Sequence, residues 1–279
     1  MARARRFDWD NLWLRVVSGV VLAPAALAMA WFGGGPFLLL VALAVTLLSI
    51  EWAAMVAPTA LARVATAMTA SVLAIAFFAY GGRLVLAAVM IFAGAVASAV
   101  VSRGATQRRA DAAYGVLYVG PACLAIIWLR HTAQGAGWTV MLLATTWAAD
   151  ICAFIAGNAL KGPKLWPRFS PNKTWSGFFG GLVGAVAAAV AAPGLPILPN
   201  GQPLLHLSLV GAGLIGLAAG LATMMGDLWE SMLKRRFGVK DSGDLIPGHG
   251  GLLDRVDGLM FATMVFAAAR LIVHYGWAH

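Results

Sequence analysis

Charge is scarce in this sequence, and its scarcity sets the class of protein. Only 11% of the 279 residues are Asp, Glu, Lys or Arg, whereas 61% are hydrophobic, and the mean hydropathy is +0.83. A soluble core of this size cannot bury that much apolar surface. Several apolar runs also reach the ~20 residues needed to cross a hydrocarbon layer of about 30 Å. The composition therefore excludes an ordinary soluble domain and predicts a polytopic membrane protein.

Residues that bind transition metals or form disulfides are also few. The two cysteines, Cys123 and Cys152, both lie in apolar runs, which argues against a disulfide framework and a zinc site. None of the five histidines has a partner at ligand spacing, and only His249, among glycines, lies in a suggestive place. The sequence has neither a Walker-type Gly-Lys-Ser/Thr loop nor a Ser-His-Asp constellation. Carboxylates, cations and glycines remain as the residues that can carry chemistry.

Long apolar runs divide the chain into spans. Strands of a membrane barrel would read as short alternating segments, whereas these runs have the length that only helices can satisfy in lipid. The sequence therefore predicts an all-α fold with about nine transmembrane helices. The nine segments are 14–32, 36–57, 61–79, 84–101, 113–129, 138–158, 175–195, 207–226 and 257–275.

The basic residues predict the orientation. An odd number of spans puts the two ends on opposite sides, and a cytoplasmic N-terminus places all of the twenty Lys and Arg residues except Arg83, Arg130 and Arg270 on the cytoplasmic side. Positive residues favour cytoplasmic loops. We therefore expect a multi-pass protein of the plasma (inner) membrane whose polar loops face the cytoplasm. The net charge of +9 is explained by these loops, and we expect no nucleic-acid partner.

The stretch from Gly226 to Asp257 is unusually charged for this chain, since it holds more than half of the eleven acidic residues. In a helix, Asp227, Ser231 and Lys234 share one face, and Arg235 lies close beside it. A carboxylate and two cations would then point the same way at the cytoplasmic end of the eighth span.

A glycine-rich turn follows Lys240. His249, Gly250 and Gly251 form its centre, and glycines let backbone N–H groups approach phosphate oxygens because no Cβ blocks the way. This pattern predicts a phosphate-binding loop. The alternative is a solvated connection whose charges pair with each other or with lipid headgroups.

The next helix begins with Asp254, Arg255 and Asp257. Carboxylates without cysteines or clustered histidines are hard-oxygen ligands, which suit Mg²⁺ better than zinc. We therefore expect these acids to face the phosphate-binding loop as metal ligands.

A second group of polar residues lies earlier in the chain. Asp150 stands inside the sixth span, where a carboxylate is costly unless it faces a polar cavity or a partner. The loop from Lys161 to Lys173 has four basic residues and no acid, so it would attract a nucleotide or an acidic lipid, although a purely topogenic loop would look the same. Glu51, near the end of the second span, is equally compatible with a cavity position and with a hydrogen bond between packed helices.

These residues resemble the phosphatidate cytidylyltransferases, also called CDP-diacylglycerol synthases. The C-terminal signature of that family is matched by Ser231, Lys234, Arg235, Lys240, Asp241, Gly243, Ile246, Pro247, His249, Gly250, Gly251, Asp254, Arg255 and Asp257. Gly226-Asp227, Ser170 to Trp175, and Trp147 to Asp150 with Gly157 are also similar. Ser176 departs from the pattern, because many members have Glu there. The resemblance is specific in the C-terminal half, so we expect one membrane domain in which 113–279 holds the catalytic helices and motif loops, and 1–112 holds less specific helices.

The resemblance implies transfer of CMP from CTP to phosphatidic acid, with Mg²⁺ as cofactor, yielding CDP-diacylglycerol and pyrophosphate. Asp227 and Asp254 are the leading metal ligands, with Asp257 and Asp150 as second choices. Phosphates would be neutralised by Lys173, Lys234, Arg235, Lys240 and Arg255, and cradled by the turn around His249, Gly250 and Gly251. Ser170, Thr174, Ser231 and Asp150 would complete the substrate site.

Two other functions use similar residues. A CTP-dependent lipid kinase of the dolichol kinase type also joins CTP to a membrane lipid. A transporter of a phosphorylated solute is a different class, but its charges are expected near the midplane and not at one membrane face. The glycines spaced by four residues in the seventh and eighth spans favour close packing inside the bundle, and the same pattern would allow a homodimer.

Overall fold

The computed structural model describes residues 9–106, 108–194, 204–245 and 250–276. Almost all of this part is helical. The elements are α1 (Trp9–Phe32), α2 (Gly34–Val56), η1 (Pro58–Ala60), α3 (Leu61–Tyr80), α4 (Leu84–Val101), α5 (Arg109–His131), α6 (Gly135–Leu160), β1 (Lys164–Trp166), β2 (Ser170–Thr174), α7 (Trp175–Ala191), η2 (Ala192–Gly194), α8 (Leu209–Arg236) and α9 (Leu253–Gly276).

The helices confirm the all-α, polytopic prediction. Within the described residues, eight helices are long and apolar enough to cross a membrane, and Gly19–Phe32 of α1 adds a shorter apolar helix. The predicted boundaries were least accurate around the charged stretch, because α8 continues to Arg236 and α9 already begins at Leu253. Hydropathy ends a span where charges begin, whereas a helix continues as long as its backbone hydrogen bonds do.

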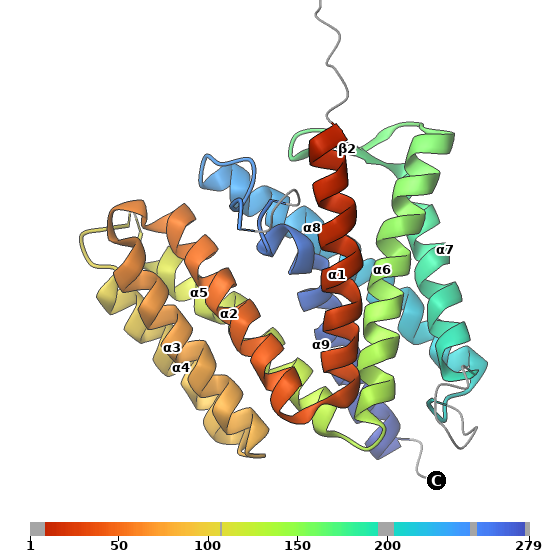
Figure 1. Ribbon diagram of the computed structural model, residues 1–279, viewed down its shortest axis with the longest axis horizontal. Coiled ribbons are helices and arrows are strands. Elements are labelled where there is room, and N and C mark those ends of the chain that lie inside the picture. Colours follow the sequence, from red (N-terminus) through yellow and green to blue (C-terminus); the bar gives the residue numbers. More distant parts are fainter. Residues whose placement is uncertain (1–8, 107, 195–203, 246–249, 277–279) are drawn as a thin grey trace, which may run out of the picture.

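The helices form two groups joined by α8 and α9. In Figure 1, α2 to α5 lie side by side on one side of the molecule, and α6 and α7 pair on the other, with α1 beside α6. Helix α8 runs obliquely from the first group to α7, and α9 packs against it. The ends of α8 and α9 that carry the charged residues therefore lie between the two groups.

Small residues bring the helices of the second group close together. A Cβ on Gly181 of α7 would lie 3.0 Å from the carbonyl oxygen of Ala149 on α6, and one on Gly216 of α8 would lie 2.9 Å from that of Ala185 on α7. No side chain larger than a hydrogen atom fits these contacts without a shift. The glycine spacing thus packs helices within the chain, as expected, and a homodimer stays a prediction.

The basic loop after α6 contains the two strands of the described residues, which the all-α prediction did not include. Strands β1 and β2 pair antiparallel, with Lys164 opposite Thr174 and Trp166 opposite Ser170. The hairpin ends at Thr174, whose hydroxyl caps α7 by accepting a hydrogen bond from the Gly177 N–H at 3.2 Å. Lys173 is therefore held at the end of a strand, immediately before a capped helix.

Candidate active site

The site is built where α8 crosses α9 at two glycines. A Cβ on Gly226 of α8 would lie 2.5 Å from the carbonyl oxygen of Asp257 and 2.9 Å from the Cα of Gly258. A Cβ on Gly258 would lie 2.8 Å from Oδ1 of Asp227. The two backbones can touch only because both positions are glycine. This contact brings Asp227 of α8 beside the first turns of α9.

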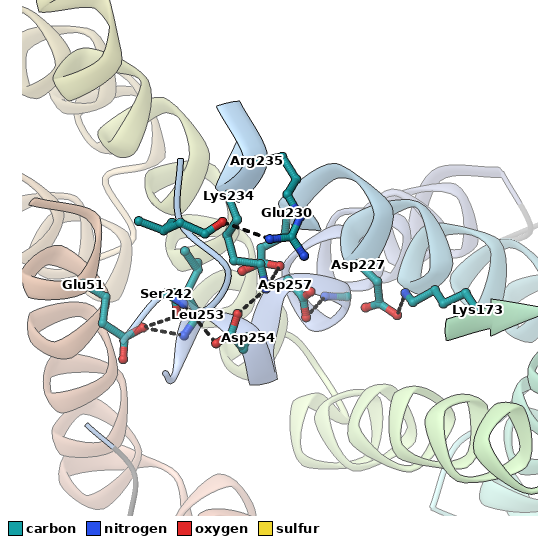
Figure 2. A network of polar contacts seen from close by, with 12 residues as sticks. Glu51, Lys173, Asp227, Glu230, Lys234, Arg235, Ser242, Leu253, Asp254 and Asp257 are labelled. Carbon is teal, nitrogen blue, oxygen red and sulfur yellow. Dashed lines mark hydrogen bonds and ion pairs between the residues drawn. The ribbon is translucent and has the colours of Figure 1, made fainter. Parts of the chain in front are cut away.

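The first ion pair joins α8 to the β-hairpin. Lys173 Nζ lies 2.6 Å from Oδ2 of Asp227, and both side chains keep part of their surface exposed. Figure 2 shows Lys173 reaching from the end of β2 to the acid on α8. The structure thus brings the two polar groups recognised in the sequence into one place.

The second ion pair joins α8 to α9. Lys234 Nζ lies 2.5 Å from Oδ1 of Asp254 and 2.7 Å from Oε2 of Glu230, one turn earlier on α8. The other Asp254 oxygen, Oδ2, accepts a hydrogen bond from the Ser242 N–H at 3.2 Å. Glu230 is 1% exposed, and its Oε1 has no hydrogen-bond partner among the described residues. Glu230 is not among the predicted site residues, although an acid one turn before Lys234 in an apolar helix is a usable signal.

Glu51 of α2 reaches the same region from the N-terminal half of the chain. It is 1% exposed, and it accepts hydrogen bonds from the N–H groups of Leu252 and Leu253, each at 2.7 Å, and from the Ser242 hydroxyl at 3.2 Å. Of the two interpretations left open by the sequence, the structure shows the hydrogen bond between packed elements. It does so at the start of α9, where the site is.

Asp150 and Asp257 complete the acidic part of the site. Asp150 on α6 has an exposed side chain and interacts electrostatically with Asp227, Lys173 and Arg255. Asp257 is 8% exposed, accepts a hydrogen bond from the Gly258 N–H at 2.9 Å, and interacts electrostatically with Asp227. Figure 2 shows Asp257 between Asp254 and Asp227. Both second-choice ligands therefore interact with Asp227, one of the leading ones.

The donor set suits a hard cation. Among the described residues, no three His, Cys, Asp or Glu side chains form a ready-made ion site. Mg²⁺ commonly uses only one or two protein carboxylates and takes its remaining ligands from water and substrate phosphates. Asp227 and Asp254 each already hold a cation, a lysine ammonium, within 2.6 Å. The residues present therefore fit Mg²⁺ bound together with a nucleotide.

The remaining predicted residues differ in exposure and in their contacts. Arg235 and Lys240 are exposed, and Arg235 donates to the Val239 carbonyl at 3.3 Å. Ser231 and Ser170 are half-buried. Thr174 is buried and caps α7, so its described role is structural.

The glycine turn is described only from its second half, because His249 lies outside the described residues. Gly250 has a φ of +80°, a left-handed conformation that favours glycine. A Cβ on Gly251 would lie 3.0 Å from Oε2 of Glu51. The turn therefore closes tightly against Glu51.

Ser176, the departure from the family pattern, lies at the base of the hairpin. Its hydroxyl lies 3.0 Å from that of Thr174 and donates to the Lys161 carbonyl. In this chain Ser176 therefore links the segment before the hairpin to the start of α7.

Comparison with known proteins identifies the family of the chain. A family model described as "Cytidylyltransferase family" matches residues 13–273. The phosphatidate cytidylyltransferase of Brucella suis biovar 1 (strain 1330) is 37% identical over 271 residues, which cover 96% of this chain and 94% of that protein. The protein of the same name from Pseudomonas aeruginosa is 36% identical over 274 residues, 94% of this chain and 97% of the relative. That of Bacillus subtilis (strain 168) is 39% identical over 146 residues, 52% of each chain.

Proposed function

The chain belongs to the cytidylyltransferase family, and from that premise we propose how its residues act in the reaction. The protein is a membrane-bound nucleotidyltransferase that transfers CMP from CTP to phosphatidic acid, giving CDP-diacylglycerol and pyrophosphate for phospholipid synthesis. One observation carries the assignment of the site. Two helix ends and a hairpin bring carboxylates and lysines together at the crossing of α8 and α9.

The reaction needs positioning more than proton transfer. An oxygen of the lipid phosphate attacks the α-phosphorus of CTP, the bond from that phosphorus to the oxygen bridging to the β-phosphate breaks, and pyrophosphate leaves. The second pKa of a phosphomonoester is about 6, so the attacking group is largely dianionic at neutral pH. No general base is required. The protein must instead hold two anions in line and stabilise the leaving group.

Lysines and arginines meet the first requirement. Lys173 and Lys234 now neutralise Asp227 and Asp254, and in the substrate complex their ammonium groups would turn to the phosphates. Arg235, Lys240 and Arg255 would add positive charge around the glycine turn, and the backbone N–H groups of a glycine-rich turn can approach phosphate oxygens because no Cβ interferes.

The carboxylates meet the second requirement by holding the metal. Asp227 and Asp254 are the proposed Mg²⁺ ligands, and Asp257 and Asp150, which interact electrostatically with Asp227, would add negative charge around the metal. When bound, Mg²⁺ would neutralise the charge that develops on the leaving pyrophosphate. Lys173 and Lys234, which now pair with these acids, would then be available to the substrate phosphates.

The active site faces the cytoplasm in this proposal. The asymmetric distribution of Lys and Arg supports that orientation, because the charged ends of α8 and α9 and the basic hairpin fall on the side rich in basic residues. CTP is a soluble anion, so a site open to that side receives it without a membrane crossing.

The test follows the label of CTP. Purified protein in detergent, given phosphatidic acid and CTP labelled at the α-phosphorus, should place the label in a chloroform-soluble product, and γ-label should appear as pyrophosphate. A lipid kinase would give the reverse, with γ-label in a lipid and none of the α-label following. That result, with a lipid alcohol as acceptor, would overturn the proposed roles of the aspartates.

A further inference from the structure

Glu51 connects the N-terminal half of the chain to the site, although the motif residues all lie in the C-terminal half. It stands near the end of α2 and is 1% exposed. Its two oxygens accept three hydrogen bonds from residues about 200 positions away, at 2.7, 2.7 and 3.2 Å. An isolated acid within a span is costly, and these bonds account for its presence there.

Two of the three hydrogen bonds to Glu51 come from backbone N–H groups at the start of α9. The first N–H groups of a helix have no acceptor within the helix, and a residue just before the helix usually caps them. The N–H groups of Leu252, just before α9, and of Leu253, its first residue, donate instead to Glu51, an acid on another helix. A negative charge is also favourable at this end of a helix. Glu51 therefore acts as the N-terminal cap of α9.

The Glu51 carboxylate also binds the loop segment that contacts Asp254. Ser242 donates its hydroxyl to Glu51, and its backbone N–H to Oδ2 of Asp254. Asp254 is the second residue of α9, so its direction depends on how the helix begins. A Cβ on Gly243 would lie 3.2 Å from Cγ of Glu51, so the loop passes directly over this side chain. Figure 2 shows Glu51, Ser242, Leu253 and Asp254 in one connected network.

We propose that Glu51 is a positioning residue for the transfer reaction: it fixes the N-terminus of α9 and Ser242, and through them it orients Asp254 and the glycine turn. Glu51 itself touches no substrate, because loop and helix backbone cover both of its oxygens. The inference rests on the proposed function, since it gives a role to a residue that supports the same site.

The alternative is a role in stability alone, and Arg130 supplies the matched control. Arg130 of α5 donates to the carbonyl oxygens of Ala30 at 2.6 Å and Trp31 at 2.7 Å, at the C-terminal end of α1. Like Glu51, it is a charged side chain that caps a distant helix with two short hydrogen bonds. It does so at the end of the bundle remote from the site, where α1 meets α5. Arg130→Gln should therefore lower the melting temperature and leave turnover per folded protein unchanged.

Glu51→Gln keeps the shape of the side chain but replaces one acceptor oxygen with an NH₂ group, which cannot accept the hydrogen bonds now made. Substitution of a residue that orients a metal ligand typically lowers metal affinity or activity 10- to 100-fold. We expect kcat per folded protein to fall by about that factor, with a smaller change in KM for CTP. The rise in melting temperature that CTP with Mg²⁺ gives the wild type should also shrink, which is a readout independent of turnover.

Ser242→Ala provides a milder second variant. It removes one hydrogen bond to Glu51 and leaves the Ser242 N–H in place, so we expect a smaller loss of kcat. Because Ser242 and Glu51 act on the same loop, the fold-decrease in kcat of the double variant should be smaller than the product of the fold-decreases of the two single variants. Glu51→Asp, which retains the charge with a shorter reach, should recover part of the activity lost in Glu51→Gln.

Hydrogen exchange tests the geometry in the wild-type protein itself. The amides of Leu252 and Leu253 should exchange slowly although they lie at a helix start, and Glu51→Gln should speed their exchange. Fast exchange of both amides in the wild type would overturn the proposal. Equal turnover per folded protein in Glu51→Gln and Arg130→Gln would also overturn it, in favour of a stability role.

The proposal and the proposed function fail in different ways. If wild-type protein forms no α-labelled lipid, the proposed function is wrong. If the wild type is active and Glu51→Gln is equally active per folded molecule, only the role of Glu51 is wrong.

Discussion

Lys173 and Asp227 are 54 positions apart in the sequence, and their side chains form an ion pair of 2.6 Å. The pair ties the basic hairpin to the end of α8, so the two polar regions of the chain form one site. A basic loop that served topology alone would not need this contact. The pairing supports a role for Lys173 beside the acids, and that role is open to test.

Asp227→Asn should abolish most of the activity. The substitution keeps the size of the side chain and removes the charge that would bind the metal, so we expect kcat to fall by at least about 100-fold. The folded protein should persist, since the ion pair with Lys173 is partly exposed and such pairs contribute little stability. Turnover and the melting temperature in detergent measure the two effects. Asp244→Asn, at an exposed acid, is the control, and equal activity of the two variants would contradict the assignment.

Lys173→Ala should mainly weaken substrate binding. A hydrogen bond to a charged group contributes about 1.5 to 3 kcal/mol, so its loss should raise KM for CTP or for phosphatidic acid about tenfold or more. Steady-state kinetics with each substrate varied in turn will show which phosphate it contacts. Lys164→Ala removes the same charge from an exposed position on the same hairpin and should change little. Unchanged KM and kcat in Lys173→Ala would return the loop to a topogenic role.

Gly226→Ala should damage the site through the backbone. The added methyl group would meet backbone atoms of α9 at 2.5 and 2.9 Å, and backbone cannot move aside as a side chain can. We expect a loss of about 1 to 3 kcal/mol in stability and a loss of activity as α8 and α9 separate. Gly213→Ala, on the same helix, meets its nearest atom at 3.7 Å and should be neutral or stabilising because alanine favours helix. Thermal denaturation and turnover compare the two, and a stable, fully active Gly226→Ala would show that the crossing is looser than described.

Single cysteines test the orientation of the site. Asp244 is an exposed residue of the loop between α8 and α9, and Gly81 is an exposed residue of the turn between α3 and α4, on the opposite side if the N-terminus is cytoplasmic. In a background lacking Cys123 and Cys152, a membrane-impermeant thiol reagent applied outside intact cells should label Gly81→Cys and not Asp244→Cys. Opening the cells should expose Asp244→Cys. Labelling of both cysteines from the same side would refute the nine-span topology.

The sequence alone predicted the helical membrane fold, because hydropathy and backbone hydrogen bonding leave few alternatives in lipid. Its signature residues from Ser231 to Asp257 also indicated the family, which the comparisons confirmed. Side chains at helical spacing, such as Asp227 and Lys234, could be placed on one face because that relation is local. The ends of α8 and α9 were less predictable, since charges interrupt hydropathy before they interrupt a helix.

Only the tertiary structure decided which residues meet. The contact of Lys173 with Asp227, the sharing of Lys234 by Glu230 and Asp254, and the capping of α9 by Glu51 all join distant segments. A single sequence carries no record of such pairs, because the energy of each depends on how helices cross and not on neighbours along the chain. Glu51 illustrates the difference: the sequence marked it as an acid that needs a partner, and packing alone determined that the partner is the first turn of α9, beside Asp254.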